Sequence, residues 1–151
     1  MQSFTDNAGR TWKVHLTIDA IRRVKAELAV DLLAIDQGDP PLLTRLGTDV
    51  ALVVDVVFAI VRPQADEAGI TDEQFGRSLG GEAIIAAHDA LLEELVDFFR
   101  SLRRVHLATA IAKQQAMLQA AIVALEAKIA QADVALAAIE TAAISGGQST
   151  S

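Results

Sequence analysis

The sequence predicts a mainly α fold with a small N-terminal β-hairpin, an α+β head followed by a long C-terminal helix. Apolar residues make up 52% of the 151 residues, but there are only five Phe, one Trp and no Tyr. A core of Leu, Ile, Val and Ala suits helices better than a β-sandwich. Residues 11–16 alternate between apolar and polar, which is typical of a half-buried strand. All three prolines lie before Phe99, and a helical heptad pattern follows it.

The hairpin is expected over residues 3–17. Residues 6–9 read Asp-Asn-Ala-Gly, in which Asn7 and Gly9 tolerate the positive φ of a tight turn. Trp12, Val14 and Leu16 share one face of the second strand, and Phe4 is expected to pair across with that face. Because an isolated hairpin is marginal in water, the apolar face must pack on helices.

Several helices are expected in the rest of the head. The first is capped by Thr17 or Asp19, and a short turn over 42–46 ends at Gly47. Thr48 or Asp49 caps a buried helix over 50–61, which ends at Arg62-Pro63. A capping box over 71–74 starts a short helix through residue 79, and an amphipathic helix covers 82–99. The expected inward stripes are Ile18, Ile21, Val24 and Leu28 on the first helix, and Ile84, Ile85, His88, Leu91, Leu92, Leu95 and Phe99 on the last.

Charge and composition divide the chain into three expected parts. These are an acidic head (1–99), a basic joint with a long amphipathic helix (100–143) and a disordered end (144–151). The head has 17 acids and 8 bases, whereas the rest has 3 acids and 5 bases. This distribution argues against a nucleic-acid partner. A polar N-terminus, no cysteine and no sufficiently long apolar run argue against secretion or a membrane span and favour the cytoplasm.

The C-terminal helix carries the candidate partner-binding residues. Its apolar positions alternate in steps of four and three, and 105–143 would span about 58 Å as one helix. Ile at heptad position a with Leu at d leans towards a parallel dimer. The flanking e and g positions are poor in charge: the e positions are Gln119, Glu126, Asp133 and Glu140, and the only charged g position is Lys128. The helix could pack on its own head, self-associate or hold another protein's helix, through Ile111, Leu118, Ile122, Leu125, Ile129, Leu136 and Ile139.

No catalytic, metal or cofactor site is expected. His15, His88 and His106 have no metal-ligand spacing, and His88 is interpreted as a partly buried packing residue. Glu93, Glu94 and Asp97 are interpreted as a solvated helix face. Asp55 is expected to be exposed or capping, or else paired with Arg22 or Arg45. The glycine-rich run 76–81 lacks the lysine of a phosphate-binding loop, so the protein is predicted to be non-enzymatic.

Several blocks of the head resemble a known family. They are 4–12 (Phe-Thr-Asp-Asn-Ala-Gly-Arg-Thr-Trp), 30–33 (Val-Asp-Leu-Leu), 62–65 (Arg-Pro-Gln-Ala), 69–76 and 91–99. This pattern is similar to the tail assembly chaperones of long-tailed phages and prophages. The resemblance implies a largely helical protein that coats the tape measure protein, helps recruit tail tube subunits and leaves before the tail is finished. It does not extend past Arg104. A structural coiled-coil protein retained in the particle and a small dimeric adaptor remain the alternatives.

Overall fold

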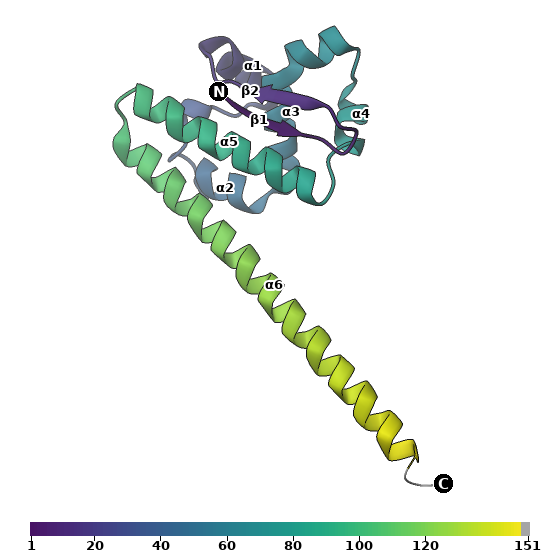
Figure 1. Cartoon of the computed structure of the whole chain (residues 1–151). Helices are drawn as coiled ribbons and strands as arrows, with labels where there is room; N and C mark the ends of the chain where they lie inside the picture. The colour runs from purple at the N-terminus through teal and green to yellow at the C-terminus, as the bar shows by residue number, and fades with distance from the viewer. Residues whose placement is uncertain (149–151) are drawn as a thin grey trace. The chain divides into compact units, whose positions relative to one another are not determined.

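The computed structural model describes the backbone of residues 1–148 and the side chains of residues 1–142. The predicted mainly α architecture with one N-terminal hairpin is confirmed (Figure 1). Residues 149–151, part of the predicted disordered end, lie outside the described residues. Residues 1–115 form one compact unit, and the described residues from 116 onwards form a second. The elements are β1 (Gln2–Thr5), β2 (Thr11–Val14), α1 (Ile18–Leu28), the 3₁₀ turn η1 (Leu32–Ala34), α2 (Leu42–Thr48), α3 (Val50–Ala68), α4 (Asp72–Arg77), α5 (Glu82–Ser101) and α6 (Val105–Gln148).

The predicted N-terminal hairpin forms, but its second strand ends at Val14, short of the predicted limit at residue 17. β1 and β2 are antiparallel, and Phe4 lies opposite Trp12 in the register. Trp12, Val14 and Leu16 are buried, because β1 packs on α5 and β2 packs on α3 (Figure 1). Gly9 takes the positive φ of the turn, at 80°. Asn7 does not, and instead its backbone N–H donates to the Ser78 carbonyl at 2.8 Å.

The central helix α3 is longer than the sequence predicts. Asp49 caps its start by accepting from the Leu52 N–H at 3.0 Å, but Pro63 does not end it. The helix continues to Ala68 and ends where Gly69 adopts φ 70°. A proline has no N–H, so Pro63 leaves the Ala59 carbonyl without its helical donor. Arg23 of α1 supplies one, since its Nη1 lies 2.9 Å from the Ala59 oxygen and 3.1 Å from that of Ile60.

The smaller helices begin where the sequence predicts, but some of them end at other residues than predicted. Thr17 caps α1 by accepting from the Ala20 N–H. Gly47 does not end α2, which runs to Thr48. Both hydrogen bonds of the predicted capping box are present at Thr71 and Gln74, although α4 ends at Arg77 rather than at residue 79. On α1, Ile21 and Val24 are buried as predicted, but Ile18, the first residue of the helix, is 52% exposed.

Helix α5 presents a different inward face from the predicted one in its first half. Leu91, Leu92, Leu95 and Phe99 are buried as expected. Ile85 is 43% exposed, and the alanines Ala83, Ala87 and Ala90 face the core instead. Small residues allow the α5 backbone to approach β1 and α3 closely, which excludes the larger side chains from that contact.

Candidate partner-binding surface

The second unit carries a long exposed apolar surface on α6. The predicted site residues Leu125, Ile129, Leu136 and Ile139 are 54–65% exposed, and Leu118 and Ile122 are partly exposed. Met117, Val123 and Val134 lie outside heptad positions a and d and are also exposed. Helix α6 reaches Gln148, past its predicted end at residue 143. Covering apolar side chains that are this exposed lowers the free energy, so they mark a surface that favours a partner.

Ile111 is a correction to the predicted site. It is fully buried in the first unit, together with its α6 neighbours Leu107 and Ala108. The first turns of α6 therefore belong to the core of the head, and Ile111 is not free to meet a partner in this conformation. The exposed seam is the remaining heptad set, and we use that name for Leu118, Ile122, Leu125, Ile129, Ala132, Leu136 and Ile139.

Two glutamines fix the start of α6 to the head, and sequence reasoning missed both. The Gln114 side-chain amide donates to the Leu43 carbonyl of α2 at 2.6 Å. The Gln115 amide donates to the Glu93 carboxylate of α5 at 3.3 Å. Two adjacent amides inside the apolar pattern, with Gln115 at a heptad position a, are the signal that could have suggested a polar anchor there.

The charges beside the exposed seam are asymmetric. Counting Ile122 and Ile129 as position a, the e positions hold Glu126, Asp133 and Glu140. The g positions hold Lys128, with alanine at 121, 135 and 142. Within the described side chains, none of the ion pairs involves these four charged residues. They are therefore available to charges on a helix packed beside α6.

Glu94 corrects the predicted solvated face of α5. Its side chain is buried because β1 packs over this part of α5, whereas Glu93 and Asp97 are exposed as expected. The Met1 amine lies 3.2 Å from Glu94 Oε2, and His15 Nδ1 lies 3.8 Å from Oε1. Glu94 follows Ala87 and Leu91 at helical spacing, and this was the available sequence signal for its burial.

A buried carboxylate organises the hairpin turn. Asp6 accepts hydrogen bonds from the Trp12 indole at 2.9 Å, the Arg10 guanidinium at 3.0 Å and the backbone N–H groups of Ala8 and Arg10. Arg10 also donates to Ser78 Oγ at 2.6 Å, which links the turn to the end of α4. Desolvation acts to raise the pKa of Asp6, but these hydrogen bonds outweigh it, so the pKa is lowered. These hydrogen bonds hold the hairpin turn together and fix it to the end of α4.

Two further titratable side chains, His88 and Asp55, have shifted pKa values. His88 is half-buried as expected, and desolvation lowers its pKa against the opposing effects of Asp89 and the Leu46 carbonyl. Asp55 is exposed, as one of its two predicted environments requires. Partial desolvation, followed by the carboxylates of Asp72 and Asp49, raises the Asp55 pKa. Among the described residues, no group of three or more His, Asp or Glu side chains could hold a metal ion.

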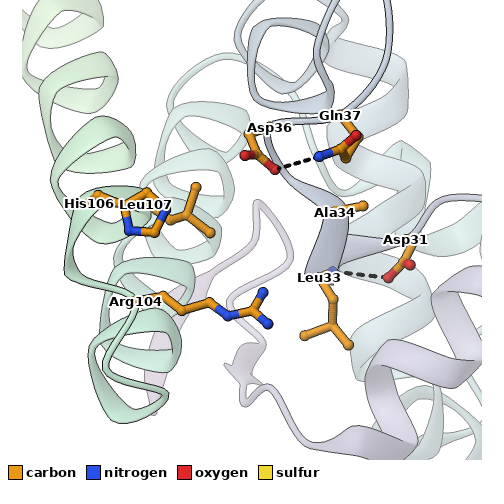
Figure 2. Close-up of a pocket in the computed structure, with 8 residues that line it drawn as sticks. All are labelled: Asp31, Leu33, Ala34, Asp36, Gln37, Arg104, His106 and Leu107. Atoms are coloured by element: carbon orange, nitrogen blue, oxygen red, sulfur yellow. Dashed lines mark hydrogen bonds between the residues drawn. The ribbon is translucent and has the colours of Figure 1, made fainter.

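A polar hollow of about 350 Å³ lies in the head between η1 and the start of α6 (Figure 2). Its carboxylates already have local partners, since Asp31 accepts from the Leu33 N–H at 3.0 Å and Asp36 from the Gln37 amide at 3.4 Å. Arg104 extends into the hollow from the opposite side (Figure 2). The lining contains no hydroxyl, thiol or amine nucleophile; it consists of Asp31, Leu33, Ala34, Asp36, Gln37, Arg104, His106 and Leu107.

Comparison of the chain with models of known protein families, with curated proteins and with solved structures finds no match. None of the helices in the described part of the chain is both long and apolar enough to cross a membrane.

Proposed function

We propose that this protein is a non-enzymatic assembly chaperone of a long-tailed phage or prophage. In the host cytoplasm it binds the tape measure protein and assists tail tube subunits in assembling around it. The proposal is carried by the exposed seam of α6, where four large aliphatic side chains are more than half exposed. The resemblance of the head to tail assembly chaperones supplies the identity of the partner.

The composition of α6 suits a chaperone that must also release its client. Burial of the seam provides an attraction proportional to the apolar area covered. Alanine at many of the surrounding positions lets a second helix approach closely without demanding one particular shape. Such a surface favours many weakly specific contacts along a long helical protein. The acidic head, with 17 acids against 8 bases, would keep the loaded complex soluble.

Co-expression with the cognate tape measure protein tests the proposal. The full-length chain is expected to keep the tape measure protein in the soluble fraction and to co-purify with it. The double variant Ile122→Asp/Ile129→Asp should lose both effects, since it places two unpaired charges in the contact. The matched control Ala120→Asp/Ala127→Asp adds the same charges at the same spacing on the opposite side of the helix and should behave like the wild type.

Two outcomes would count against the proposal. A tape measure protein that stays insoluble beside the wild-type chain would remove the chaperone function itself. Equal activity of the Ile122→Asp/Ile129→Asp variant and its control would remove the seam as the binding surface. Recovery of the chain from mature purified particles would instead favour the alternative, a structural coiled-coil protein retained in the particle.

A further inference from the structure

The exposed seam has the side-chain pattern of a two-stranded coiled coil. In its first two heptads the β-branched Ile122 and Ile129 occupy position a, while Leu118 and Leu125 occupy position d. This arrangement favours parallel pairs over larger bundles. The last heptad reverses the order, with Leu136 at a and Ile139 at d, so the preference rests on the first two.

The charges beside the seam distinguish between orientations. In an antiparallel pair the e edges of the two helices face each other, which would set the row of Glu126, Asp133 and Glu140 against the same row of a second copy. In a parallel pair, each g position faces the e position five residues further along the other helix. Lys128 then lies beside Asp133 of the other copy, and the symmetry of the pair makes this contact twice.

The parallel arrangement also fixes the register. At the remaining parallel g–e positions, alanines 121 and 135 face Glu126 and Glu140 of the other copy, so no like charges meet. A shift by one heptad would move Lys128 beside Glu126 or Glu140 and leave three or more large side chains of the seam uncovered. The in-register pair covers the whole seam.

We propose that two copies of this chain pair in parallel and in register along residues 118–139, joined by two Lys128–Asp133 contacts. This inference does not rest on the proposed function, because it is argued from α6 alone. Such a dimer covers the seam when no other helix is bound. Its two exposed charge pairs and the small alanine at position 132 add little to its stability.

Cysteine cross-linking of the purified full-length protein tests the orientation, because the chain has no cysteine of its own. Position a residues of a parallel, in-register pair lie close enough for a disulfide. Ile122→Cys is therefore expected to form a cross-linked dimer under mild oxidation, whereas the control Ala120→Cys, on the outer side of the helix, should not. An antiparallel pair would set each a position beside a d position of the other helix, which keeps the two copies of position 122 apart and gives no Ile122→Cys homodimer.

Sedimentation equilibrium tests the charge pairs. Lys128→Glu turns two attractive contacts into two repulsive ones and should weaken dimerisation about tenfold. Adding Asp133→Lys to that variant should restore it. A monomeric wild type at about 100 μM, or a dimer unaffected by Ile122→Asp/Ile129→Asp, would overturn the inference. Because these measurements use the purified chain alone, their outcome is independent of tape measure binding.

Discussion

Replacement of Arg23 tests why helix α3 continues past Pro63. Pro63 removes the N–H that would normally bond to the Ala59 carbonyl, four residues earlier. The Arg23 guanidinium donates to that carbonyl at 2.9 Å and to the next one, on Ile60, at 3.1 Å. Ala59 and Ile60 are 1% and 5% exposed, so water cannot readily take the place of the missing donor. Arg23→Ala should therefore leave a buried acceptor unsatisfied.

The expected cost follows from these contacts. A hydrogen bond from a charged donor contributes about 1.5–3 kcal/mol, and an unpaired buried carbonyl costs a similar amount. The two Arg23 bonds share one guanidinium nitrogen and are not additive. Arg23 also pairs with Asp19, but this carboxylate is 82% exposed and contributes little. Arg23→Ala should lower the free energy of unfolding by about 2–3 kcal/mol.

Urea unfolding followed by tryptophan fluorescence is the suitable assay. Trp12 is the only tryptophan and is 3% exposed, so its emission reports on the head and not on the exposed part of α6. The neighbouring exposed residue provides a matched control, and Arg22→Ala should change the free energy of unfolding by less than about 0.5 kcal/mol.

A double-mutant cycle with Pro63→Ala gives the decisive comparison. Alanine at this exposed position restores a backbone N–H for the Ala59 carbonyl, so loss of Arg23 should then cost about 1 kcal/mol less. If Arg23→Ala costs the same with proline and with alanine at position 63, the explanation of the continuous α3 is wrong.

Three further predictions concern other parts of the head and α6. The lowered pKa of Asp6 stabilises the fold above about pH 4, and this contribution is lost as the pH falls through the folded-state pKa. Asp6→Asn should therefore destabilise the head at pH 7. In urea titrations between about pH 2 and 7, the stability of this variant should depend less on acid than that of the wild type. Ala29 adopts φ 55° after α1, so Ala29→Gly should raise the thermal midpoint through a gain of about 1 kcal/mol, and an unchanged or lower midpoint would contradict this. Ile111→Asp should unfold the head, as seen by Trp12 fluorescence, whereas Ile129→Asp should change its stability by less than about 0.5 kcal/mol.

Local signals predicted much of the fold because they act over a few residues. The turn at 6–9, the alternation around Trp12 and the capping box at Thr71 each depend on neighbours in sequence, and the structure contains all three. The heptad pattern likewise predicted a long helix after Arg104, because a helical period repeats along one chain. The exposure of Ile129 and Leu136 is the part of the candidate site that such a pattern can indicate.

The largest errors come from contacts between distant segments. The local preference of Pro63 is to end a helix, and only Arg23, forty residues earlier, provides the donor that lets α3 continue. Glu94 resembles its exposed neighbour Glu93 until β1 covers it. Helical period alone cannot separate Ile111 from Ile129, because both lie on the same heptad face.

By itself, the sequence of this protein determined its hairpin and its α-helices, several of the caps that start these helices, and the apolar face of α6. The tertiary structure alone decided where that face stops being core and becomes surface. It did so by packing Ile111 into the head and by bonding Gln114 to the Leu43 carbonyl of α2. The physical reason is that a helical period fixes which side chains share a face, whereas burial depends on what another part of the chain places against that face.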